Sequence, residues 1–144
     1  MKTLILLAGL IAATPGWAAL GGPASQAAST TQSSAASTAA GVAYTDQQTT
    51  LSSGTVVHEY ADAGGTVFAV SWSGPFQPDL KALLGPWFDV YTAQAAQNKG
   101  HGHARMEVRN ADLVVISTGR MGDFQGRAWL VSRLPQGFAL EALK

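Results

Sequence analysis

Two alternating stretches on either side of a glycine turn are the feature that most constrains the fold of this chain. Large apolar side chains alternate with small ones over residues 66–73. In residues 55–61, Val56, His58 and Tyr60 fall on one side of a strand and Val57 and Glu59 on the other. Residues 62–65, Asp-Ala-Gly-Gly, join the two stretches with residue types that tolerate a positive φ. The pattern predicts a β-hairpin with one buried face. The large residues on that face are Phe68, Val70 and Trp72.

Two short consecutive helices are predicted after the hairpin. Asp79 can cap the first helix by accepting a backbone N–H, and Gly85 ends that helix. Pro86 suits the first position of the second helix, which runs to about residue 98. The apolar positions at helical spacing are Leu80, Leu83, Leu84, Trp87, Val90, Tyr91 and Ala95.

Further strands are predicted on both sides of the helices. Residues 44–51 form a polar edge strand, and residues 105–109, 113–118 and 127–131 form three strands near the end of the chain. The order of strands, helices and strands predicts an α+β fold. Its antiparallel β-sheet has about five to six strands, with two consecutive helices inserted mid-chain and packed on one face.

The N-terminus has the layout of a secretory signal peptide. Lys2 precedes an apolar run at residues 4–13, and Gly16 and Ala18 place small residues before a cut after Ala18. The alternative, a buried N-terminal helix, is disfavoured because a polar low-complexity tract follows so closely. Residues 1–18 are therefore predicted to direct export, which places the protein in the periplasm or outside the cell.

The tract after this leader lacks the side chains of a folded segment. Residues 23–40 contain no charged or aromatic residue and nothing larger than glutamine. Such a composition buries too little apolar surface to offset the entropy of ordering. Residues 19–42 are therefore predicted to be a disordered tether rich in serine, alanine and threonine, and residues 43–144 a single α+β domain.

Composition excludes several classes of protein. The 144 residues include nine basic and nine acidic side chains, so the chain has no electrostatic footprint for nucleic acid. It has no cysteine, which excludes a disulfide-stapled fold and a lipid-anchored lipoprotein. The later apolar runs are too short to span a membrane.

Several segments together resemble one family of exported bacterial proteins, catalogued as domain of unknown function 2844. The resemblance extends over nearly all of the chain after residue 18, and it implies export and a shared fold. It implies no activity, because the family has none assigned. The segments are residues 19–22 (ALGG), 53–60 (SGTVVHEY), 74–80 (GPFQPDL), 83–88 (LLGPWF), 119–122 (GRMG) and 126–130 (GRAWL).

The histidines are the first candidates for metal ligands in the sequence. His101 and His103, two residues apart in a glycine-rich loop, could hold Zn²⁺ or Cu²⁺ with His58 as a third ligand. A solvated loop is the favoured interpretation, so no metal site and no cofactor is predicted. His58 and Glu59 are strand neighbours that point to opposite faces, and no catalytic residue is predicted.

Residues that could contact a partner lie in the predicted loops and turns. Phe76 and Phe124 flank glycine or proline, and an apolar patch there would mark a binding surface. Arg120 and Arg127 belong to a glycine-rich segment that could cradle an anion, although an ordinary wide hairpin turn is the favoured interpretation. The other aromatic residues fit a core better than a sugar-stacking platform.

The sequence therefore favours a non-enzymatic exported domain. It would bind or assemble with another envelope or secreted protein, or with a cell-surface polymer. The alternative is a small cell-envelope hydrolase whose site is not recognisable from the sequence.

Overall fold

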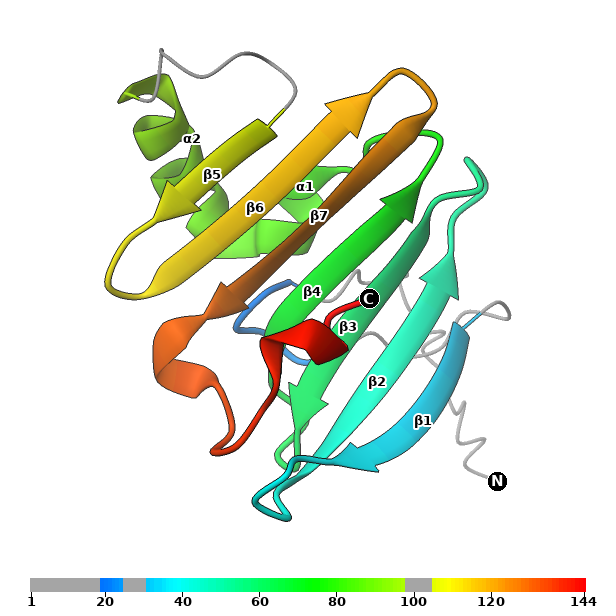
Figure 1. Ribbon diagram of the computed structural model, residues 1–144, viewed down its shortest axis with the longest axis vertical. Helices are drawn as coiled ribbons and strands as arrows, with labels where there is room; N and C mark the ends of the chain where they lie inside the picture. The colour runs from blue at the N-terminus through cyan, green and yellow to red at the C-terminus, as the bar shows by residue number, and fades with distance from the viewer. Residues whose placement is uncertain (1–18, 25–30, 98–104) are drawn as a thin grey trace, which may run out of the picture.

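The computed structural model describes residues 19–24, 31–97 and 105–144, which build one antiparallel sheet with a helical segment behind it (Figure 1). The sheet has seven strands in the order β1-β2-β3-β4-β7-β6-β5. The predicted leader, residues 1–18, lies outside the described residues. The strands are β1 Thr31–Ser37, β2 Ala43–Thr50, β3 Val56–Asp62, β4 Val67–Gly74, β5 Arg105–Arg109, β6 Leu113–Arg120 and β7 Asp123–Leu130.

The structure confirms the α+β fold, with seven strands rather than five or six. The two predicted helices are joined into one 18-residue segment, residues 80–97. Helix α1, Leu80–Leu84, passes through a 3₁₀ turn, Gly85–Trp87, into α2, Phe88–Gln97. Asp79 caps α1 as predicted, because its Oδ1 accepts the backbone N–H groups of Lys81 at 2.9 Å and Ala82 at 3.1 Å.

The predicted hairpin is β3–β4, and its register contains a bulge that the alternating pattern does not reveal. Tyr60 pairs with Ala69 and Ala61 pairs with Val67, so Phe68 is an extra residue on β4. The expected common face for Phe68, Val70 and Trp72 is therefore wrong. Phe68 packs on one side of the sheet, and Val70 and Trp72 pack on the other.

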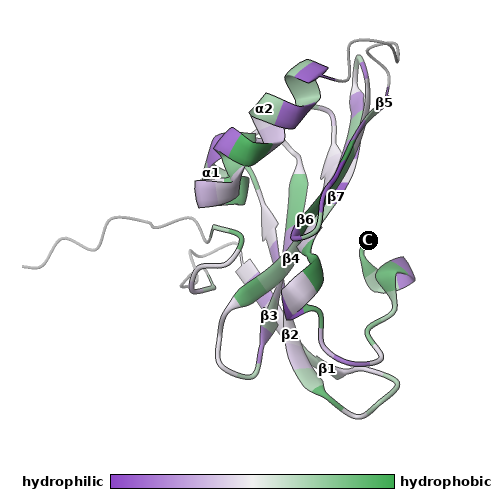
Figure 2. Cartoon of the chain, turned by 90° about the vertical axis from the view of Figure 1, so that its left-hand side faces the viewer, coloured by the Kyte–Doolittle hydropathy of each residue, from purple (hydrophilic) through white to green (hydrophobic). Residues whose placement is uncertain are grey.

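The two faces of the sheet are covered by different parts of the chain (Figure 2). On the helix face, Leu83 and Leu84 are buried with Trp72 and a row of aliphatic strand residues. The opposite side, called here the C-terminal face, is covered by residues 134–144. There Leu143 is buried with Tyr60, Phe68 and Trp129, and Phe138 packs against them. The sheet thus has a filled core on the helix face and a thinner cover on the C-terminal face.

The predicted tether is corrected at its first residues. Leu20 is fully buried in the helix-face core, and its N–H donates to Leu83 O at 2.9 Å. The N–H of Gly21 donates to Val67 O at 2.8 Å. Gly85, at φ 52°, leaves room for this segment, because a Cβ at that position would lie 2.5 Å from the Ala19 Cβ. One large apolar side chain, Leu20, is enough to dock the segment.

The predicted tether is also corrected over residues 31–37. These residues form β1, which pairs with β2 from Thr31↔Thr49 to Ser37↔Ala43. β2, expected at the sheet edge, is therefore an interior strand. Small polar side chains suffice here because backbone hydrogen bonds to an existing strand supply the pairing.

Candidate functional site

A polar recess lies on the C-terminal face, where the last two residues of the chain meet the ends of four strands. Its volume is about 340 Å³. Strands β4, β7, β6 and β5 form its floor, and Leu143 and Lys144 form one wall. The residues that line it are Trp72, Ser73, Arg105, Ile116, Thr118, Gln125, Gly126, Arg127, Leu143 and Lys144.

The side chains lining the recess include three cations and no carboxylate. They are Arg105, Arg127 and Lys144. Arg105 is paired on one side, since its Nη2 donates to Glu107 at 3.0 Å, and Arg109 shares the same carboxylate. The hydrogen bonds from Arg109 and Arg105 hold the pKa of Glu107 below its usual value. Among the described residues, Arg127 makes one long contact, Nη1 to Leu140 O at 3.4 Å, which leaves most of its guanidinium donors for a ligand.

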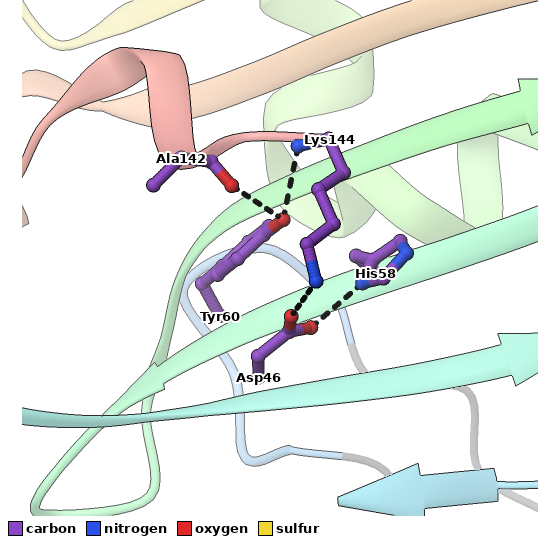
Figure 3. Close-up of polar contacts among 5 residues, drawn as sticks. All are labelled: Asp46, His58, Tyr60, Ala142 and Lys144. Atoms are coloured by element: carbon purple, nitrogen blue, oxygen red, sulfur yellow. Dashed lines mark hydrogen bonds and ion pairs between the residues drawn. The ribbon is translucent and has the colours of Figure 1, made fainter. Parts of the chain in front are cut away.

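A charged cluster ties the end of the chain to β2 and β3 next to the recess (Figure 3). Asp46 Oδ1 lies 2.8 Å from His58 Nδ1, and Asp46 Oδ2 lies 3.5 Å from Lys144 Nζ. Burial alone would raise the pKa of Asp46, but His58 and Lys144 together hold it below its ordinary value of 3.8. Asp46 is therefore a carboxylate throughout the neutral range.

Tyr60 fixes the backbone of the same terminal residues (Figure 3). Its hydroxyl donates to Ala142 O at 3.2 Å and accepts from the Lys144 N–H at 3.2 Å. Burial raises the pKa of Tyr60, so the hydroxyl stays protonated and able to donate. The Asp46–Tyr60 register pair places both groups under the end of the chain.

Ser71 stands opposite His58 in the β3–β4 ladder, so an aspartate, a histidine and a serine come from three adjacent strands. A nucleophilic serine needs its hydroxyl bonded to the imidazole. Ser71 Oγ is buried and makes no hydrogen bond of ordinary geometry to any residue that the structure describes, and all three residues lie at least nine-tenths buried. The arrangement serves as a structural anchor and lacks the contact that a catalytic triad requires.

A family model supplies the decisive comparison. The model for proteins of unknown function DUF2844 matches residues 16–143, which is most of the chain. The chain belongs to the DUF2844 family. No curated protein and no solved structure matches it. The family assignment therefore confirms the resemblance seen in the sequence and adds no activity.

The described part of this DUF2844 chain contains no site built from several histidines. His101 and His103 lie outside them. His58 is buried on β3 and bonded to Asp46. Across residues 19–24, 31–97 and 105–144, no three histidine, aspartate or glutamate side chains are grouped as metal ligands.

Of the four predicted contact residues, only Arg127 lines the recess. Phe76 is 60% exposed in the loop after β4. Phe124 is partly buried at the start of β7, where its ring covers Gly119 on the neighbouring strand. Arg120 is exposed at the tip of the β6–β7 hairpin, whose turn is a tight Met121-Gly122 pair and not a wide loop.

Sequence reasoning missed Asp46 and Lys144. They are 98 positions apart in the numbering, and only the tertiary fold brings them together. Asp46 sits in a polar strand where a carboxylate is ordinary. The one weak sequence signal for Asp46 was its position in a strand next to the predicted hairpin.

Proposed function

We propose that this DUF2844 protein is a binding module whose recess on the C-terminal face holds an anionic group of a cell-surface polymer. The observation that supports it is the recess lining, with three cationic side chains and no acidic side chain. Ser73, Thr118 and Gln125 add hydroxyl and amide groups, which suit the oxygen atoms of a sugar acid or a phosphate.

The exposed apolar residues favour a polymer over a protein partner. Protein interfaces have an apolar centre with aromatic residues. Within the part of the chain that the structure describes, the large exposed apolar residues come from separate loops and turns. They are Val42, Phe76, Met121 and Val131. None of them lines the recess, so its chemistry is that of a polar, charged ligand.

Export is part of the proposal, and the leader-like N-terminus supports it. No helix among the described residues is long and apolar enough to cross a membrane. Cleavage after Ala18 would keep Leu20, which the core requires. Mass spectrometry of the protein from culture medium or periplasm is expected to show Ala19 as the first residue. A chain that retains Met1 would contradict export by this route.

Binding is tested with polygalacturonate and inorganic phosphate as probes in calorimetry at low salt. Arg127→Ala is expected to weaken binding by about tenfold, because hydrogen bonds to a charged group are worth about 1.5–3 kcal/mol. The affinity of Arg127→Lys should lie between those of the wild type and Arg127→Ala, since lysine keeps the charge and loses the planar fork of donors. Affinity should drop as salt rises, as for any exposed ionic contact.

Arg133→Ala is the matched control, because Arg133 is exposed and outside the recess. It removes the same charge and should leave affinity unchanged. Equal affinity for a neutral polymer such as dextran, or an equal loss with both variants, would contradict the proposed site. Turnover of an ester or glycoside by the wild-type protein, lost in His58→Ala, would instead favour the hydrolase.

A further inference from the structure

We infer that residues 134–144, called here the C-terminal latch, regulate the recess, and that an anion in the recess releases the latch from Asp46. This inference rests on the proposed function for its ligand. The structural basis is that Lys144 belongs to two sites at once. It lines the recess, and its Nζ lies 3.5 Å from Asp46 Oδ2.

The contact between Lys144 and Asp46 is long and partly open to solvent. The side chain of Lys144 is 68% exposed, while that of Asp46 is 11% exposed. A distance of 3.5 Å and this exposure give a weak ion pair. An anion in the recess offers Lys144 a second carboxylate or phosphate partner, so the ligand and Asp46 compete for one ammonium group.

The earlier part of the latch is held by aromatic packing around Phe138. Phe138 meets the rings of Phe68 at 5.0 Å and Tyr44 at 5.2 Å in edge-to-face geometry. Leu143 is only 5% exposed. The aromatic contacts hold the base of the latch, around Phe138. The tip of the latch, residues 142–144, is held by the burial of Leu143 and by contacts to the Tyr60 hydroxyl and Asp46. Because Lys144 lies in the tip and not in the base, we infer that the tip moves when Lys144 changes partner.

Release of the tip would lengthen the recess along the sheet. Arg127, which already lines it, pairs in register with Ser71, and Ser71 pairs with His58. Leu143 and Lys144 form the wall on this side. With the tip lifted, a polymer can continue from Arg127 across β4 toward β3, where the Ser71 hydroxyl has no hydrogen bond of ordinary geometry to any described residue.

Competition of this kind makes a reciprocal prediction. The Asp46 contact weakens ligand binding by the same factor as the ligand weakens the Asp46 contact. Asp46→Asn removes the competing charge and keeps the shape of the side chain. We expect about two- to fivefold tighter binding of polygalacturonate and phosphate, together with faster hydrogen exchange at the Leu143 and Lys144 amides. Saturating wild-type protein with either probe should accelerate the same two amides.

Two variants make the test specific. Asp89→Asn removes the same charge from α2, behind the sheet, and should change neither affinity nor exchange. Tyr60→Phe removes the hydroxyl that accepts from the Lys144 N–H, and should accelerate exchange at the tip without changing any charge. Measurement is by amide hydrogen exchange in NMR spectra and by calorimetry on the whole mature chain.

The latch inference is overturned if Asp46→Asn is folded and binds the probes no better than wild type. It is also overturned if saturating ligand leaves exchange at Leu143 and Lys144 unchanged. Failure of the proposed function has a different signature, because neither protein would then bind either probe. In that event the ligand-free exchange rates decide, and equal rates in wild type and Asp46→Asn reject the latch as well.

Discussion

Replacing Trp72 by alanine is expected to lower the free energy of unfolding by about 3–5 kcal/mol, the range for large aromatic residues in a core. Trp72 is 1% exposed on the helix face, and its ring occupies the space over Gly126 on β7. No hydrogen bond is lost with it, because Nε1 has no partner among the described residues. The loss would come entirely from packing, and urea unfolding measures it.

Trp87→Ala is the matched control for this prediction. Trp87 carries the same side chain on the same face but is only partly buried against the core. A loss for Trp87 as large as that for Trp72 would mean that burial does not set the cost. A Gly126→Ala variant adds a coupling test, since its Cβ would clash with the Trp72 ring and lie 2.9 Å from Ile116 O. The clash with the ring should be relieved in the Trp72→Ala background, whereas the close approach to Ile116 O remains.

Replacing Leu20 by alanine is expected to cost about 2–5 kcal/mol, although Leu20 lies in a stretch that reads as a tether. The residue is fully buried between α1 and β4, and its backbone is hydrogen-bonded to Leu83. A domain of this size has about 5–15 kcal/mol of stability, so the variant should unfold at clearly lower urea concentration.

Met121→Ala provides the comparison for Leu20, because Met121 is fully exposed in the β6–β7 turn. Its unfolding midpoint should match that of the wild-type protein. If Leu20→Ala also matched the wild type, residues 19–24 would be a tether after all, and the docking of this segment would be wrong.

Local patterns predicted the parts of the fold that are held together locally. The β3–β4 hairpin follows from alternation around a glycine turn, and the start of α1 follows from the Asp79 cap. The bulge at Phe68 escaped because alternation assumes an even register. Strand β1 escaped because its backbone, and not its side chains, supplies the pairing energy.

The candidate site was predictable only in part, because tertiary contacts and not local patterns assemble it. Arg127 was identified from its glycine-rich context, and it lines the recess. Asp46 and Lys144 are joined by the sheet order and the return of the chain end, which no window of sequence contains. A polar site on a sheet face is assembled by register, so each member looks ordinary in its own strand.

The sheet order also determines when this protein can fold. The central ladder pairs β4 with β7, and the Tyr60 hydroxyl meets residues 82 and 84 positions later in the chain. Contacts so far apart in sequence raise the contact order, which slows folding, although the other five ladders join consecutive strands. The central sheet cannot close until β7 has been synthesised, and residues 134–144, which cover its C-terminal face, follow β7 in the chain. The consecutive hairpins β1–β4 can pair earlier, so the β4–β7 ladder is the late step of folding.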